Sequence, residues 1–184
     1  LPDQHTPCRR VPHLADGHGV PPTAVSRLDY RTCMRRVERT VRMAATAAEI
    51  YAFLTEPANV PKWQTGVTSS VRTSPPPTVA GSTGRITMEV MGQRIAAGTR
   101  ILEAVPDRRL VIATSASGMS VIGSLDLAEV DGGTRLTFRS EIKADNIFMA
   151  PLEGIVADAA ERDVDASLAR LSAAVAAGRA KPAD

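Results

Sequence analysis

Three histidines and one cysteine lie close together near the start of the chain: His5, Cys8, His13 and His18. Histidine and cysteine are frequent zinc ligands, and both serve in nucleophilic catalysis. Cys33 is the only further residue of either type, so the chain from Met34 onward contains neither. Chemistry that needs histidine or cysteine is therefore confined to residues 1–33.

This leader, residues 1–33, contains five of the thirteen prolines and shows no sustained apolar periodicity. Such a segment cannot bury enough apolar surface to offset the entropy lost on ordering. Its histidines and cysteines form no compact paired-ligand motif. We therefore expect a flexible leader, no metal site and no cofactor. Because Met34 directly precedes the first strand-like segment, one hypothesis is that the leader is not part of the natural protein, which expression of residues 34–184 alone would test.

Two charged residues, Arg39 and Asp163, interrupt otherwise apolar stripes. An unpaired buried charge is costly, so the two are candidates for a buried pair that moves protons. The alternative places Arg39 at a rim and Asp163 on a solvated helix flank. We favour that alternative and leave the catalytic residues unassigned.

The elements that would position these residues follow from hydrophobic spacing. Alternate apolar residues predict a half-buried strand from Arg36 to Met43. Thr46 and Glu49 have the spacing of a capping box, which predicts a short helix that ends at Pro57. A further one or two helical turns are expected around the only tryptophan.

Residues 67–144 read as six further strands, each joined to the next by a short loop. The sequence Asp131-Gly132 is a hairpin signal, because both residue types accept a positive φ. Residues 148–177 predict one long amphipathic helix. The order is strand, short helix, six strands and long helix, which favours an antiparallel sheet with one solvated face.

Composition excludes several function classes. From Met34 onward the chain has 18 Lys+Arg and 17 Asp+Glu, evenly interspersed, and few aromatic residues, so we expect no nucleic-acid binding. No apolar run approaches the roughly 20 residues of a membrane helix, so we expect no stable membrane insertion. Two cysteines supply no disulfide framework, and we expect a cytoplasmic protein.

The stretch VERTVRMAATAAEIYAFLTEPANVPKW resembles the opening of the polyketide cyclase/dehydrase and lipid-transport proteins, a START-like family of the SRPBCC superfamily. Three later stretches agree with that family: VAGSTGRI, VPDRRLV and DGGTRLTFRSEI. The resemblance covers residues 36–178. It implies an α+β helix-grip fold, in which a curved antiparallel sheet of six to seven strands holds a long C-terminal helix. Residues 34–184 would then form one START-like ligand-binding domain.

The resemblance also implies an internal cavity between sheet and helix. Short inward side chains such as Ala97, Thr99 and Gly123 independently favour a hollow there. The expected ligand-binding residues are those on strands or helices that face this hollow: Trp63, Ile86, Met88, Val90, Ile101, Ile112, Val121, Phe138, Leu152, Ile155, Val156 and Ala159.

We favour a non-enzymatic carrier or sensor of a hydrophobic small molecule, such as a lipid or polyketide-like compound. One alternative is an aromatic polyketide cyclase or dehydratase that uses polar residues of the same cavity. Another is a protein-interaction module similar to stress-associated or toxin-associated START-like proteins. The sequence specifies neither the ligand nor the oligomeric state.

Overall fold

The structure is a computed structural model, and it describes residues 35–90, 92–145 and 153–180. The chain consists of two units, Leu1–Cys33 and Met34–Asp184, each defined by the contacts among its own residues. Every residue described below belongs to the second unit. The predicted flexible leader, with its histidines and cysteines, lies outside the described residues.

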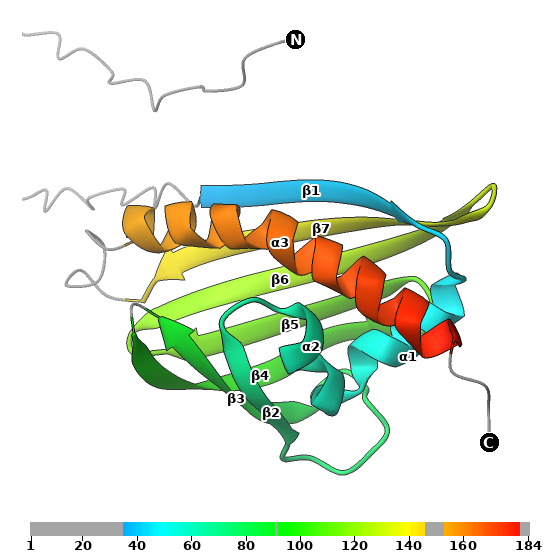
Figure 1. The fold of residues 1–184 in the computed structure, drawn as a ribbon. Coiled ribbons are helices and arrows are strands. Elements are labelled where there is room, and N and C mark those ends of the chain that lie inside the picture. The colour runs from blue at the N-terminus through cyan, green and yellow to red at the C-terminus, as the bar shows by residue number, and fades with distance from the viewer. Residues whose placement is uncertain (1–34, 91, 146–152, 181–184) are drawn as a thin grey trace, which may run out of the picture. The chain divides into compact units, whose positions relative to one another are not determined.

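One antiparallel sheet of seven strands, in the order β1-β7-β6-β5-β4-β3-β2, forms the frame of this unit (Figure 1). Each strand except β1 pairs with the strand that precedes or follows it in the chain, and β1 closes onto β7. The strands are β1 (Arg35–Met43), β2 (Val67–Arg72), β3 (Thr83–Val90), β4 (Gln93–Val105), β5 (Arg109–Ala116), β6 (Met119–Val130) and β7 (Gly133–Ala144).

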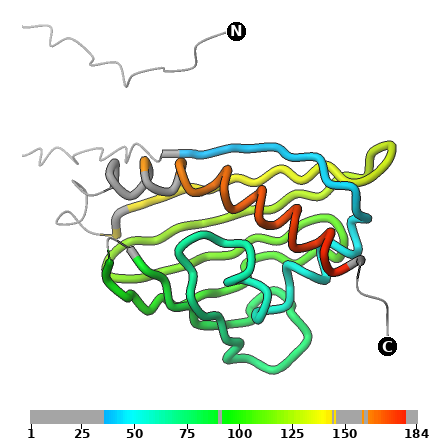
Figure 2. Tube along the Cα trace, in the orientation of Figure 1, coloured from blue at the N-terminus to red at the C-terminus, as the bar shows by residue number. Residues whose placement is uncertain are grey.

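Helices cover one face of the sheet. The long helix α3 (Glu153–Ala180) lies across the strands, and α1 (Ala47–Thr55), the 3₁₀ turn η1 (Pro57–Asn59) and α2 (Val60–Trp63) lie near its C-terminal half (Figure 1). Figure 2 traces how the chain turns back on itself between α1 and β2. The predicted α+β helix-grip fold, with a curved sheet of six to seven strands and a long C-terminal helix, is confirmed.

The start of α1 is stabilised by the predicted capping box. The Glu49 amide donates to Thr46 Oγ1 at 3.2 Å, and the Thr46 amide donates to Glu49 Oε2 at 2.8 Å. These bonds satisfy backbone donors that the first helical turn leaves without partners. The helix then buries Ile50 and Leu54 against the sheet.

The main core lies between α3, α1 and the β1, β5, β6 and β7 strands. On α3 the buried apolar positions advance by four, three and four residues, close to the helical period: Val164, Leu168, Leu171 and Val175. Across from them Leu136 is fully buried. Burial of each such side chain stabilises the fold by about 1.5–3 kcal/mol.

The opposite face of the sheet carries a chain of ion pairs across neighbouring strands. Arg139 pairs with Glu38 on one side and with Asp126 on the other, and Asp126 also pairs with Arg109. Arg109 in turn contacts Glu103 at 2.9 Å. Because these side chains are partly exposed, each ion pair adds little stability. Together, however, the carboxylates neutralise the charges of Arg109 and Arg139.

The β6–β7 connection is the predicted hairpin turn at Asp131-Gly132. Gly132 has a φ of +77°, a conformation that side chains rarely adopt. The next residue, Gly133, begins β7 and pairs with Val130. The turn therefore depends on two glycines in succession.

Candidate functional site

An inner pocket of about 100 Å³ lies between the sheet and the α1–α2 segment. Strands β2 to β6 supply its floor, and α1, η1 and α2 supply its opposite wall. Its apolar lining consists of Leu54, Pro57, Val60, Trp63, Val71, Ile86, Ile101, Leu110, Ile112 and Leu125, together with Gly84. The volume is below the roughly 300–1,000 Å³ of most small-molecule sites, so the pocket in this conformation suits a small guest.

Polar groups also line the inner pocket. They are Thr55, Gln64, Ser70, Arg72, Thr78, Ser82, Thr83, Thr99 and Thr114. Arg72 is the only charged residue among the described residues of the lining. The mixture of an apolar wall with a few polar groups is typical of pockets that bind and orient small molecules.

Arg72 and Thr78 converge on one carbonyl at the pocket rim. Arg72 Nη2 and Thr78 Oγ1 each donate to the Thr55 carbonyl oxygen at 3.1 Å. This oxygen belongs to the last residue of α1, where helical carbonyls lack partners within the helix. The two bonds tie the end of β2 and the loop after it to α1.

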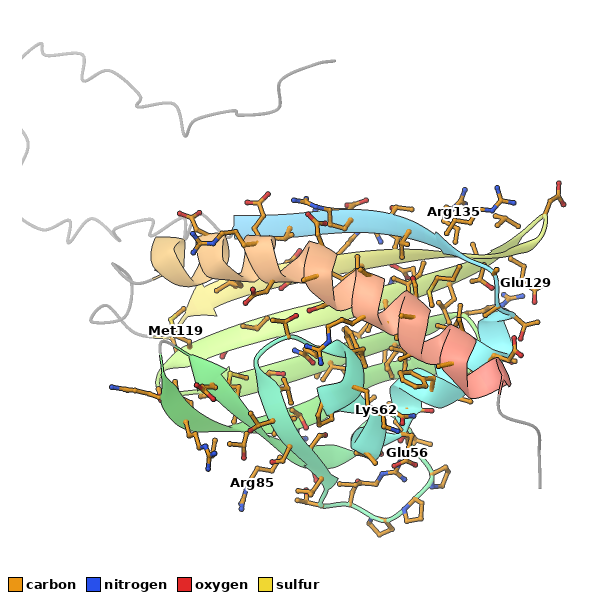
Figure 3. The ribbon with its side chains drawn as sticks, in the orientation of Figure 1. Glu56, Lys62, Arg85, Met119, Glu129 and Arg135 are labelled. Atoms are coloured by element: carbon orange, nitrogen blue, oxygen red, sulfur yellow. The ribbon has the colours of Figure 1, made fainter. Side chains whose placement is uncertain are left out.

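Trp63 forms part of the helical wall. Its side chain is 7% exposed, and its indole Nε1 is buried without a hydrogen-bond acceptor among the described residues. A buried donor without a partner costs about 1–3 kcal/mol. The neighbouring Lys62 points out to solvent, where its Nζ donates to Asn59 Oδ1 at 2.7 Å (Figure 3).

The α2 segment that carries Trp63 is held by the long helix. The Thr65 amide donates to Ser167 Oγ at 3.0 Å, and Arg170 Nη2 donates to the Pro61 carbonyl at 3.1 Å. Helix α3 therefore positions the pocket wall, although the described part of α3 does not itself line the pocket.

The two charged residues singled out in the sequence do not meet. Arg39 donates to Asp165 Oδ1 at 3.0 Å and to Glu161 Oε1 at 3.1 Å, whereas Asp163 is exposed. The hydrogen bond with Glu161 is the largest cause that raises the pKa of the Arg39 guanidinium, and Asp165 adds to it. Arg39 therefore ties β1 to α3 near the surface, and neither residue lines the inner pocket.

Four of the residues expected to bind ligand line the inner pocket: Trp63, Ile86, Ile101 and Ile112. Three others lie elsewhere. Met88 packs against the small cluster of Val67, Ile86 and Ala97, Phe138 packs on the main core, and Val121 is partly buried on β6. For these three, the simple alternation of strands placed the side chain on the correct sheet face but not at the pocket.

The remaining expected residues are not placed by the described part of the chain. Leu152 lies outside the described residues, as do the side chains of Val90, Ile155, Val156 and Ala159. Contact between any of the expected residues and a ligand stays a prediction.

Sequence reasoning missed Arg72, Ser70 and Thr114 as pocket residues. The first two lie on β2, where a bulge between Val67 and Ser69 shifts the pairing with β3. Thr114 could have been found from the sequence, because it lies two residues after Ile112 on β5 and therefore points to the same inner face.

A second hollow, of about 500 Å³, lies at one end of the sheet. Its lining consists of Ala47, Asp107, Arg108, Leu127, Ala128 and Glu129. Glu129 projects at this end of the molecule (Figure 3). The hollow is larger than the inner pocket, but only six residues line it and three of them are charged, so the inner pocket, with its larger apolar lining, is the better candidate site.

Among residues 35–90, 92–145 and 153–180, no group of three or more His, Cys, Asp or Glu side chains is placed to hold a metal ion. None of the described helices is both long and apolar enough to cross a membrane.

A curved sheet that grips a long helix, with a small pocket under a short helical segment, defines a helix-grip domain of the SRPBCC ligand-binding type. The chain belongs to the polyketide cyclase / dehydrase and lipid transport family, whose model matches residues 34–176. Some members of this fold are polyketide cyclases. The family resemblance read from the sequence is thereby confirmed.

Solved structures agree on the fold. The Zhui aromatase/cyclase from a Streptomyces species superposes with a TM-score of 0.65 at 18% identity, over 77% of this chain and 93% of that one. A protein from Thermus thermophilus has a TM-score of 0.65 at 16% identity, over 78% and 99% of the two chains. A protein from Rhodobacter sphaeroides has a TM-score of 0.61 at 24% identity, over 77% and 92%. No curated protein matches the chain.

Proposed function

We propose that the protein binds a small hydrophobic molecule in the inner pocket, as a carrier or sensor. The observation that carries this proposal is the pocket itself, a hollow of about 100 Å³ between the sheet and the α1–α2 segment with an apolar majority in its lining. A guest that removes this apolar surface from water gains roughly 25 cal/mol per Å².

Larger guests require the pocket to expand. The part of the wall that we expect to move is the one that carries Trp63. It belongs to a four-residue helix whose N-cap residue, Asn59, accepts no hydrogen bond from the backbone amides of the first turn. The buried N–H of Trp63 lacks an acceptor in the described part of the chain, so a conformation that supplies one is stabilised relative to this one. A lipid-sized guest would therefore displace α2 rather than the paired strands of the floor.

A carrier or sensor is favoured over an enzyme by the chemistry of the lining. Its described residues include no carboxylate, histidine, cysteine, lysine or tyrosine. Proton transfer near neutral pH needs a group that titrates there, and arginine stays protonated. A ligand can still be bound and released without such a group.

The second candidate is an aromatic polyketide cyclase or dehydratase, which the family description and the likeness to an aromatase/cyclase support. In that function Arg72 would stabilise an enolate while water carries the proton. The test is exchange of the α-protons of 2,4-pentanedione in heavy water, followed by NMR. Catalysed exchange that Arg72→Gln abolishes would establish the enzyme, and exchange at the rate of buffer would exclude this role.

Binding is tested through Trp63, because it is the only tryptophan of the chain. We expect its fluorescence to change saturably when toluene is added, and native mass spectrometry of the purified protein to show any guest that co-purifies. Ile112→Phe and Ile101→Phe fill the pocket from its floor and are expected to abolish the response.

Ile122→Phe is the matched control, because Ile122 is 41% exposed on the neighbouring strand and does not line the pocket. Circular dichroism checks that each variant is folded. A wild-type protein that shows no saturable response, or folded pocket-filling variants that bind as well as wild type, would overturn the proposal.

A further inference from the structure

A row of four residues crosses the pocket floor from the edge of the sheet. In the register of the sheet Arg72 on β2 lies opposite Gly84, Gly84 lies opposite Thr99, and Thr99 lies opposite Thr114. All four line the inner pocket. The row thus begins with the cation of Arg72, continues through Gly84, which has no side chain, and ends with the hydroxyls of Thr99 and Thr114.

Arg72 differs from the arginines of the ion-pair chain on the other face. Those arginines each contact carboxylates, whereas no carboxylate of the described residues lies within 4.0 Å of Arg72. Its Nη2 holds the Thr55 carbonyl, and its remaining donors have no partner in the described structure. A guanidinium in this state favours an anionic partner, because charge-assisted hydrogen bonds are the strongest that it makes.

The hydroxyls of Thr99 and Thr114 are likewise without hydrogen-bond partners in the described part of the chain. They lie on the floor next to the apolar Ile101 and Ile112. A hydroxyl donates and accepts, so either threonine can bind an oxygen of a guest.

Gly84 lets its neighbours in the row approach closely. A β-carbon on residue 84 would lie 2.8 Å from Thr99 Oγ1 and 2.9 Å from the Val71 carbonyl oxygen. Both separations are shorter than real contacts of a β-carbon. The absence of a side chain here lets the Thr99 hydroxyl and the Val71 carbonyl approach the backbone of β3, and a side chain at residue 84 would displace Thr99 from the row.

We infer that the inner pocket selects a small carboxylic acid whose carboxylate accepts hydrogen bonds from Arg72, while a hydroxyl or carbonyl oxygen further along the guest bonds to Thr99 or Thr114. The apolar body of the acid lies against Ile101 and Ile112. This inference rests on the proposed function and adds a charge preference to it. A single unpaired arginine matches the single negative charge of a carboxylate.

The experiment compares benzoate with benzamide, a neutral molecule of similar shape, by calorimetry on the full chain. Wild type is expected to bind benzoate about tenfold or more tightly than benzamide, since a hydrogen bond to a charged group contributes about 1.5–3 kcal/mol. Arg72→Gln is expected to lower benzoate affinity to the level of benzamide, and Arg72→Lys to keep most of the preference.

Arg85→Gln is the matched control. Arg85 lies next to Gly84 on β3 but is exposed and projects away from the sheet (Figure 3), so its loss is expected to leave both affinities unchanged. Thr99→Val and Thr114→Val test the hydroxyls. At least one of them is expected to weaken 2-hydroxybenzoate more than benzoate.

The outcomes separate the two proposals. Equal affinities of wild type for benzoate and benzamide, absence of benzoate binding, or a folded Arg72→Gln that keeps the preference would overturn the carboxylate inference. Binding of toluene in the same protein would at the same time uphold the hydrophobic pocket. If toluene also fails to bind, both the proposed function and this inference are wrong.

Discussion

The backbone of Gly133 lies against the carbonyl oxygen of Met43 so closely that a β-carbon on residue 133 would overlap it, and would lie 3.0 Å from the carbonyl carbon. This contact joins the start of β7 to the end of β1. Because both partners are backbone atoms, neither can move aside by changing rotamer. Gly133→Ala is therefore expected to destabilise the protein by about 1–3 kcal/mol or more, as overpacking does.

Gly98→Ala is the control for that substitution. Gly98 lies within β4, and a β-carbon there would have no heavy atom within 4 Å. Alanine is expected to leave stability unchanged or to raise it by about 0.5–1 kcal/mol, because glycine loses more entropy on folding. Urea unfolding of the two variants measures the difference, and equal stabilities would contradict the close contact.

Thr134 supplies the second prediction. Its side chain is fully buried, and its Oγ1 donates to the Ala45 carbonyl at 2.7 Å. Thr134→Val keeps the shape but leaves a buried acceptor unsatisfied, which costs about 1–3 kcal/mol. Thr137→Val on the same strand removes only an exposed contact with Thr40 and is expected to change the free energy of unfolding by less than about 0.5 kcal/mol.

The third prediction concerns alkaline pH. Burial is the main cause that raises the pKa of the Tyr51 hydroxyl above its usual value of 10.0, and the negative charge of Asp107 adds to it. The folded state thus binds this proton more tightly than the unfolded state does. The stability gained from this tighter binding of the Tyr51 proton is fully present below about pH 10, and it is lost as the pH rises through the raised pKa of Tyr51.

Tyr51→Phe is accordingly expected to reduce the loss of unfolding free energy above about pH 10, measured by urea unfolding across the alkaline range. Asp107→Asn is expected to move the tyrosinate titration at residue 51 to lower pH, because it removes the neighbouring negative charge. A tyrosinate titration that is the same with and without Asp107 would show that the charge has no effect.

The fourth prediction distinguishes the two charged residues of the sequence analysis. Arg39 has two carboxylate partners, but they are 52% and 68% exposed, so Arg39→Gln is expected to cost only about 0–1 kcal/mol, and less in high salt. The pKa of Arg39 is raised, so its contribution is constant below about pH 12 and is lost only above that. Asp163→Asn is expected to have no effect on stability, and a larger effect than that of Arg39→Gln would contradict the pairing.

Most of the fold could be predicted from the sequence because local signals agreed with long-range packing. Alternation identified the strands, the Thr46–Glu49 spacing marked the start of α1, and the Asp131-Gly132 step marked the hairpin. Each of these signals depends on neighbouring residues only. The pairing of β1 with β7 was not predicted, since no local pattern encodes which strands meet.

The part of the polar lining that lies on β2 could not be predicted, because it depends on a bulge. Counting alternate residues from the buried Val67 places Ser69 and Val71 inside and Ser70 and Arg72 outside. The structure inserts Thr68 as an extra residue, so Ser70 and Arg72 line the pocket, whereas Val71, which also borders it, is 55% exposed. The unpredicted Arg72 is the only cation of the described lining.

The first two strands of the chain, β1 and β2, lie at opposite edges of the sheet. Strands β2 to β7 each find a partner next to them in the sequence, but Arg39 of β1 meets Phe138, almost a hundred positions later. Contacts between such distant residues form slowly, and chains emerge from the ribosome at about 5–20 residues per second. During synthesis β1 therefore waits several seconds for its partner β7, and the helix that grips the sheet can dock only after both strands have been made.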